Sequence, residues 1–281
     1  NILMIGPTGV GKTHSVRTIA ELMGVPFGRV VVPDLTPSGY KGANIQDVLA
    51  AEVKRLERLY SNPTRIVIQL DEFDKVVKQG ETFSPMVQSE FLKILEPGSP
   101  LVIDIHYGDI ESVEMRAMLV LSGAFSFIKY QPEQGISEDD LRANGFMDEL
   151  IGRMGAPISL RALTRDDFVA MLSADPPLSF VTQSTADLLS FGIQVTLEPE
   201  AIEHLAVAAV QSKMGARRLA SDFRAVMDRL KERLFFGGGT QIDGIAIEDL
   251  AEGKRLFRMK KQFVERNIRG SANARQLGFR T

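Results

Sequence analysis

The stretch that decides the fold is Gly6-Pro7-Thr8-Gly9-Val10-Gly11-Lys12-Thr13, which follows the short apolar run Asn1-Ile2-Leu3-Met4-Ile5. It fits the phosphate-loop pattern G-x-x-x-x-G-K-[ST] without a mismatch, and a helix pattern follows over 15–23. Its glycines let successive backbone N–H groups turn inward around an anion, and the following helix N-terminus adds partial positive charge. A strand, such a loop and a helix, in this order, predict a phosphate-binding loop in an α/β fold.

The last two residues of this loop carry most of its chemistry. Lys12 is expected to reach the β- and γ-phosphates of a nucleotide, and the Thr13 hydroxyl is expected to ligate Mg²⁺. The alternative is a glycine-rich turn that arose by chance. The Lys-Thr pair, placed between a strand pattern and a helix pattern, argues against that alternative.

Length and composition limit the class of protein. With 281 residues, of which 44% are apolar and 25% charged, the chain has the composition of a globular protein with one large and one small domain. A net charge of −3 argues against a surface built broadly for nucleic acid, and no apolar run is long enough to span a membrane. The absence of cysteine excludes disulfides and cysteine-ligated zinc within this chain, and it fits a cytoplasmic protein.

The rest of the chain alternates predicted strands and helices up to about residue 174 and is mostly helical afterwards. Strands are expected at 27–32, 66–70, 117–121 and 158–160, a hairpin at 101–114, and helices at 44–60, 85–95, 140–153, 178–192, 199–213 and 216–236. Asp175-Pro176-Pro177 is the predicted hinge, and Thr164 is expected to cap one more helix. We therefore expect a parallel α/β sheet sandwiched by helices over 1–174, a small mainly helical lid over 175–253, and a basic tail over 254–281. The tail is expected to be solvated or disordered, with binding to an acidic partner as the alternative.

Two acids follow the apolar strand at 66–70. Asp71 and Glu72 should lie on the same edge of the sheet as the phosphate loop, because ligands of open α/β sheets bind beyond the carboxyl ends of the strands. Asp71 can hold Mg²⁺ through its water shell, and Glu72 can accept a proton from the water that attacks the γ-phosphate. Taken alone, the pair would equally suit the surface end of a strand. Beside the phosphate loop, it predicts a nucleotide-hydrolysing site.

An ordered set of motifs makes the chain resemble the AAA+ ATPases, specifically the ClpX/HslU class of hexameric protein unfoldases. Besides the phosphate loop, the motifs are Gly39-Tyr40-Lys41-Gly42, Leu70-Asp71-Glu72, Ser122-Gly123-Ala124-Phe125, Leu150-Ile151-Gly152-Arg153 and Gly215-Ala216-Arg217. The resemblance covers the chain to about residue 250. It implies a P-loop NTPase (AAA+) fold with a helical lid, ATP and Mg²⁺ as cofactors, a ring-shaped homo-oligomer, and a polypeptide substrate threaded through a central pore.

The resemblance also assigns roles to single residues. Nucleotide contacts are implied for Gly6, Pro7, Thr8, Gly9, Val10, Gly11, Lys12, Thr13, His14, Asp71, Ser122 and Arg217, and metal contacts for Thr13 and Asp71. The implied catalytic set is Lys12, Glu72, Arg153 and Arg217. Arg153 would reach the nucleotide of the neighbouring subunit, and Arg217 would contact phosphate and couple the two domains. Ser122 would orient the attacking water; the alternatives are a surface arginine at 153 and a strand-end serine without function at 122.

Tyr40 indicates what such an ATPase acts on. A tyrosine between Gly39 and Gly42 places apolar area on a loop, which is usually disfavoured. In the resembled class this loop lines the pore and its aromatic grips an extended polypeptide, although here Lys41 stands where a valine is usual. The alternative is a buried loop anchor. The hairpin tip around His106-Tyr107 resembles, more loosely, the second pore loop of that class.

Several features of the resembled class are missing from this sequence. They are the cysteine-zinc domain, the long inserted domain, and the stretch before the first strand that normally holds the adenine. Separately, no signal peptide is visible. The segment 127–140 lacks the Ile-Gly-Phe loop that docks a peptidase, which makes a peptidase partner doubtful. The main alternative function is an AAA+ motor or loader acting on nucleic acid, which Lys41 hints at but Tyr40 and the acidic balance disfavour. A non-catalytic scaffold is a third option, and the intact Lys12, Asp71 and Glu72 argue against it.

Overall fold

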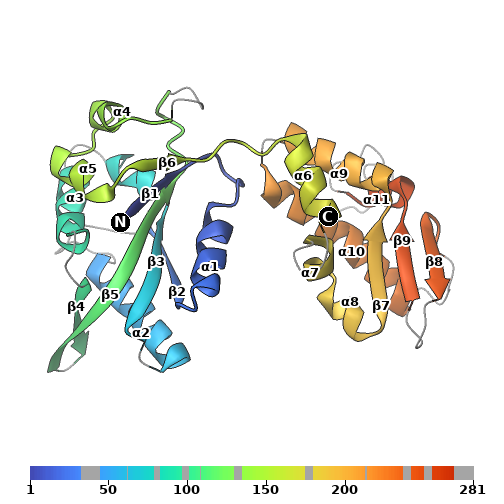
Figure 1. Cartoon of the computed structure of the whole chain (residues 1–281), viewed down its shortest axis with the longest axis horizontal. Helices are drawn as coiled ribbons and strands as arrows, with labels where there is room; N and C mark the ends of the chain where they lie inside the picture. The colour runs from blue at the N-terminus through green and yellow to red at the C-terminus, as the bar shows by residue number, and fades with distance from the viewer. Residues whose placement is uncertain are drawn as a thin grey trace, which may run out of the picture. The chain divides into compact units, whose positions relative to one another are not determined.

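The computed structural model describes residues 1–32, 45–61, 63–78, 83–96, 101–107, 109–129, 135–174, 180–212, 214–236, 242–249 and 255–268. The chain folds as two compact units, Asn1–Ala162 and Leu163–Thr281 (Figure 1). Among the described residues, no helix combines the length and the apolar character needed to cross a membrane.

A parallel sheet organises the first unit. Its strands are β1 (Ile2–Ile5), β2 (Phe27–Val31), β3 (Arg65–Asp71), β5 (Asp109–Gly123) and β6 (Pro157–Ser159), in the order β2-β3-β5-β1-β6. Each neighbouring pair is parallel, so the carboxyl ends of all five strands meet at one edge. The predicted parallel α/β sheet is confirmed.

The strand β5 is longer than the sequence suggests. Its first part pairs antiparallel with β4 (Leu101–Tyr107), which forms the predicted hairpin, and its second part pairs with β3 and β1. The separate strand predicted at 117–121 is therefore wrong as a separate element. No glycine or proline interrupts the chain between 109 and 122, so nothing breaks the strand after it leaves the hairpin.

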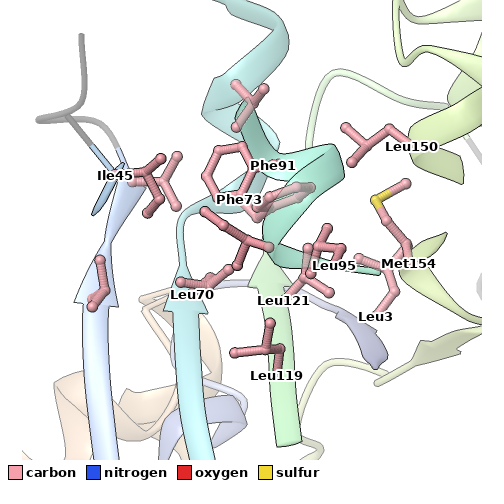
Figure 2. Packing of buried hydrophobic residues seen from close by; sticks show 14 of the residues in the cluster. Leu3, Ile45, Leu70, Phe73, Phe91, Leu95, Leu119, Leu121, Leu150 and Met154 are labelled. Atoms are coloured by element: carbon pink, nitrogen blue, oxygen red, sulfur yellow. The ribbon is translucent and has the colours of Figure 1, made fainter. Parts of the chain in front are cut away.

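Helices cover both faces of this sheet. The helix α1 (Lys12–Leu22) lies on one face, and α2 (Ile45–Tyr60), α3 (Phe83–Ile94) and α5 (Asp148–Met154) pack on the other, where the short helices η2 (Phe73–Lys78) and α4 (Glu138–Ala143) also contribute. Figure 2 shows Leu3, Leu70, Leu119 and Leu121 of the strands against Phe73, Phe91, Leu150 and Met154 of the helices and Leu95, which directly follows α3. Because successive strand residues point to opposite faces, burying Leu70 on this side turns Gln69 and Asp71 toward the face of α1. That alternation brings polar groups to the helix that follows the phosphate loop.

The second unit combines helices with a small sheet. Its strands β7 (Ile193–Leu197), β9 (Arg255–Met259) and β8 (Ile245–Asp249) lie in the order β7-β9-β8. Its helices are α6 (Arg165–Ser173), α7 (Phe180–Ser184), α8 (Ala186–Ser190), α9 (Pro199–Gln211), α10 (Ala216–Phe236) and α11 (Lys261–Asn267). The described part of this unit is thus mainly helical, as the sequence predicts for residues beyond the hinge.

The boundary between the units lies earlier than the sequence suggests. The helix α6 starts with the predicted capping box, in which Thr164 and Asp167 exchange hydrogen bonds. Its apolar residues Phe168 and Leu172 are buried in the core of the second unit, together with residues of α9 and α10. Therefore α6 belongs to the second unit, and the boundary falls at Ala162–Leu163 rather than after residue 174.

The expected basic tail is wrong over 255–268. This segment forms the central strand of the small sheet and the helix α11, and Phe257, Met259, Phe263 and Val264 are buried. Strand alternation explains the difference: in β9 Phe257 and Met259 face the core, while Arg258 between them faces outward and pairs with Glu248. Residues 269–281 lie outside the described part of the chain.

Replacing Phe257 tests whether this segment is part of the core. Its side chain is 0% exposed, so Phe257→Ala is expected to lower the free energy of unfolding of the second unit by about 3–5 kcal/mol. Phe236→Ala is the matched control, because Phe236 is 87% exposed and should change that free energy by less than about 0.5 kcal/mol. Urea denaturation of the full chain measures both. Equal, small effects would mean that residue 257 belongs to a solvated tail.

Candidate nucleotide site

The phosphate loop has the backbone that its sequence predicts. Gly9 and Gly11 have φ angles of 81° and 98°, in the left-handed region that side chains disfavour. At Gly6, a Cβ atom would lie 2.8 Å from the backbone oxygen of Leu160, so a side chain there would collide with main chain. The helix α1 starts directly after Gly11 and has no acidic residue in its first turn. A helix N-terminus of this kind suits a phosphate.

The side chain of Lys12 folds back over the loop. Its Nζ donates hydrogen bonds to the carbonyl oxygens of Gly6, at 2.6 Å, and Pro7, at 3.0 Å. The ammonium group therefore lies against the start of the loop, and the motif predicts that this loop binds phosphate.

A buried chain of hydrogen bonds links the loop to the acid pair. Gln69 Nε2 donates to Thr13 Oγ1 at 3.2 Å and to Ser122 Oγ at 2.7 Å, and Ser122 Oγ donates to Asp71 Oδ1 at 2.8 Å. Gln69 and Ser122 are both 0% exposed. Because Asp71 and Ser122 face each other in the register of β3 and β5, the strands hold this chain in place. The hydroxyl of Ser122 is thus placed to fix Asp71, and its role in orienting water stays a prediction.

Asp71 is held from both sides. Its Oδ2 accepts hydrogen bonds from Arg29 Nε at 3.0 Å and Arg29 Nη2 at 2.5 Å. Burial alone would raise the pKa of Asp71, but the hydrogen bonds from Arg29 and Ser122 and the charge of Arg29 outweigh it and lower that pKa below its ordinary value. The carboxylate is therefore ionised at neutral pH, as a metal ligand must be.

Glu72 sits on a strained turn at the end of β3. Its φ angle is 58°, one of three positive values among the described non-glycine residues, and its backbone N–H donates to Asp71 Oδ1 at 3.0 Å. The side chain is exposed, directly beside the buried Asp71. Left-handed backbone in a non-glycine residue costs about 1–3 kcal/mol and is concentrated at functional sites. The turn presents a carboxylate to solvent at the edge where the phosphate loop ends.

Asp74 ties the segment after β3 to the segment after β5. It is 1% exposed, and its Oδ1 accepts a hydrogen bond from the backbone N–H of Ala124 at 3.3 Å. A Cβ on Gly123 would lie 2.5 Å from that oxygen, so a glycine is needed there.

Sequence reasoning missed Asp74, Gln69 and Arg29. The signal for the last two was visible, because each is a polar residue inside an otherwise apolar strand run.

Arg153 lies at the opposite edge of the sheet from the phosphate loop. Asn1, which directly precedes β1, donates from Nδ2 to the carbonyl oxygen of Arg153 at 2.8 Å, whereas the loop follows the end of this strand. Four strand residues span roughly 13 Å. The guanidinium donates to the carbonyl oxygen of Leu92 and lies 2.9 Å from Glu96 Oε2. Within one subunit, Arg153 is therefore not part of the site that Lys12 and Asp71 form.

For the remaining predicted site residues, the structure gives only the exposure of Arg217 and His14 and does not describe the others. Arg217 is exposed in the first turn of α10 in the second unit, and its neighbour Arg218 pairs with Asp222 at 2.7 Å. This ion pair engages Arg218 within its own helix, and the contact of Arg217 with nucleotide stays a prediction. His14 is exposed on α1. Tyr40, Lys41 and the hinge at 175–177 lie outside the described residues.

The phosphate loop follows β1, and Asp71 at the end of β3 is linked to it by hydrogen bonds through Ser122 and Gln69. These two features, at the carboxyl edge of a parallel sheet, define a P-loop NTPase. Residues 2–117 match the family model described as "ATPase family associated with various cellular activities (AAA)". Residues 2–117 therefore form an AAA ATPase domain, and the AAA+ resemblance inferred from the motifs is confirmed.

The relatives that this chain resembles are named "ATP-dependent Clp protease ATP-binding subunit ClpX". The chain is 29% identical to the protein from Bacteroides fragilis, 28% to that from Porphyromonas gingivalis and 27% to that from Treponema denticola. Each match covers 81% of this chain and 64% of the relative. The chain therefore spans less than two thirds of the length of these relatives, 64% in each case.

Proposed function

We propose that this protein hydrolyses Mg²⁺-bound ATP as a ring-shaped homo-oligomer, a hexamer, and uses the energy to unfold or remodel polypeptides threaded through its central pore. The observation that carries the proposal is the hydrogen-bonded chain from Thr13 through Gln69 and Ser122 to Asp71. It joins the two motifs on which phosphoryl transfer depends. The ClpX-like sequence supports the same function, and we place the protein in the cytoplasm.

The residues present fit Mg²⁺. The Thr13 hydroxyl and the ionised Asp71 carboxylate are hard oxygen donors, and Mg²⁺ in such sites takes few protein ligands because phosphates and water complete its shell. When bound, the ion would neutralise charge on the β- and γ-phosphates. Lys12 would hold the same phosphates from the loop. Glu72 would accept the proton of the water whose oxygen attacks the γ-phosphorus, while the bridging oxygen leaves with ADP.

The position of Arg153 supports the proposed ring. Stabilising the transferred phosphoryl group needs a fixed cation, and the arginine of the same chain lies at the far edge of the sheet. In our proposal a neighbouring subunit supplies Arg153, so each complete site needs two copies of the chain. Arg217 contacts phosphate from the second unit and couples the two domains to the state of the nucleotide.

The substrate is assigned from the loop motif around Tyr40. The relatives are named as subunits of a protease, but segment 127–140 of this chain lacks the Ile-Gly-Phe tripeptide, so we propose a remodeller that acts without a docked peptidase. An aromatic side chain grips an extended polypeptide through apolar contact, independent of sequence.

Tyr40→Ala tests the substrate class. The variant is expected to keep basal ATP turnover within about twofold and to lose at least about tenfold in the rate of unfolding a fluorescent protein with an unstructured tag, because a large aromatic anchor is removed. Tyr60→Ala is the matched control, since Tyr60 is an exposed tyrosine at the end of α2, outside the loop motif. Unchanged unfolding by Tyr40→Ala would contradict the assignment. Loss of DNA-stimulated turnover instead would favour the nucleic-acid motor.

A further inference from the structure

A charged residue lies in the middle of the edge strand β2. Arg29 stands between Gly28 and Val30, and it faces Gln69 in the register of β2 and β3. From there its guanidinium reaches Asp71 Oδ2 with two nitrogens, at 2.5 and 3.0 Å. A planar guanidinium that engages a carboxylate with two donors forms a strong, directional ion pair.

The ion pair uses Oδ2 of Asp71, whereas the hydrogen bonds from Ser122 and Glu72 go to Oδ1. Asp71 Oδ1 accepts hydrogen bonds from Ser122 Oγ at 2.8 Å and from the backbone N–H of Glu72 at 3.0 Å. Arg29 approaches Oδ2 from β2, whereas the phosphate loop follows β1, on the other side of β3 in the sheet order. Arg29 thus neutralises the metal-binding carboxylate from the side away from the loop.

We propose that Arg29 is an internal counter-ion of Asp71 that competes with Mg²⁺ for this carboxylate and leaves it when Mg²⁺–nucleotide binds. The inference rests on the proposed function and adds a positioning residue to it. A guanidinium on Asp71 repels an arriving divalent cation and neutralises the charge that attracts it. Arg29 therefore raises the Mg²⁺ concentration that nucleotide binding requires.

The structure offers the guanidinium another place to lie. The side chain of Arg29 is 41% exposed and lines a groove of about 490 Å³ between α1, the edge of β2 and α2. Glu21 and Glu52 line the same groove, as do Arg17 and Arg55, and Glu52 accepts a hydrogen bond from the backbone N–H of Arg29 at 3.0 Å and pairs with Arg55. Release of Asp71 therefore leaves the guanidinium in an open groove lined by charged side chains of both signs, rather than in apolar surroundings.

The test compares Arg29→Met with Arg29→Lys and Arg55→Met. Methionine removes the charge and keeps an unbranched side chain, and lysine keeps the charge but loses the two-donor fork. Arg55 is the matched control, because it lines the same groove and pairs with Glu52 at 2.7 Å. Binding of a fluorescent non-hydrolysable ATP analogue is titrated with Mg²⁺, and the melting temperature of the nucleotide-free protein is measured with and without Mg²⁺ alone.

Arg29→Met is expected to lower the Mg²⁺ concentration for half-maximal nucleotide binding by about tenfold, with Arg29→Lys intermediate and Arg55→Met unchanged. Mg²⁺ alone should raise the melting temperature of Arg29→Met more than that of the wild type. If Arg29→Met fails to fold, Arg29→Lys decides by the same titration.

If Arg29→Met is less stable but needs the same Mg²⁺ concentration for nucleotide binding, the Arg29–Asp71 ion pair is only structural. If Arg29→Met needs more Mg²⁺, Arg29 helps the site to bind the metal. Either result overturns the inference and leaves the proposed function intact. Wild-type protein that binds no nucleotide with Mg²⁺ would instead overturn the proposed function.

Discussion

Replacing Glu72 by glutamine is expected to lower ATP turnover by about 10²–10⁴-fold while leaving ATP affinity nearly unchanged, because a general base contributes that much to rate. Glutamine has the shape of glutamate but cannot accept the proton of the attacking water. The side chain of Glu72 is exposed and is not part of the hydrogen-bonded chain to Thr13, so the variant should keep the phosphate and metal contacts. Steady-state hydrolysis and equilibrium binding of ATP measure the two effects separately.

Glu96→Gln is the control for this substitution. Glu96 is also an exposed acid of the first unit, but it pairs with Arg153 at the other edge of the sheet. It should lose far less activity than Glu72→Gln. Near-normal turnover by Glu72→Gln would remove Glu72 as the base, and loss of ATP binding would show that the strained turn, rather than the proton transfer, had been damaged.

Arg153→Ala is the second substitution with a large expected effect. An arginine supplied to the γ-phosphate accelerates hydrolysis by about 10³–10⁵-fold, so turnover should fall by that order with ATP binding retained. The matched control is Arg142→Ala, which removes an exposed arginine of the nearby helix α4 that pairs with Asp139 and Asp148. That variant should keep its activity.

The contacts of Arg153 within its own subunit offer a competing explanation. The guanidinium bonds the carbonyl oxygen of Leu92 and pairs with Glu96, so the substitution could act by loosening α3 and α5. If so, Glu96→Ala should reproduce most of the loss, and the melting temperature of Arg153→Ala should fall in parallel with its activity. A role in the neighbouring site instead leaves Glu96→Ala active.

Local motifs account for the part of the site that the sequence predicts. The phosphate loop is a continuous stretch whose glycines and helix start dictate its conformation, and the apolar strand before Asp71 implies a parallel sheet that brings both motifs to one edge. For the same reason the helix cap at Thr164 and the helix Ala216–Phe236 are confirmed.

The contacts between side chains of neighbouring strands could not be predicted, because they depend on the register in which the strands pair. That Arg29 reaches Asp71, and that Gln69 bridges Thr13 and Ser122, follows from the alignment of β2, β3 and β5, which no local pattern fixes. The strand β9 was missed because its arginines gave the segment a basic composition, while alternation buried Phe257 and Met259. Composition describes the outer face of such a strand, and packing depends on the inner one.

The measurement that tests the shared site most directly mixes two inactive variants, Glu72→Gln and Arg153→Ala. In a ring, an Arg153→Ala subunit keeps its own Glu72 and can receive Arg153 from a Glu72→Gln neighbour. Random assembly at equal amounts makes about a quarter of the sites complete, so the mixture should regain about a quarter of wild-type turnover. A mixture as inactive as its two components would contradict a site completed by the arginine of an adjacent subunit.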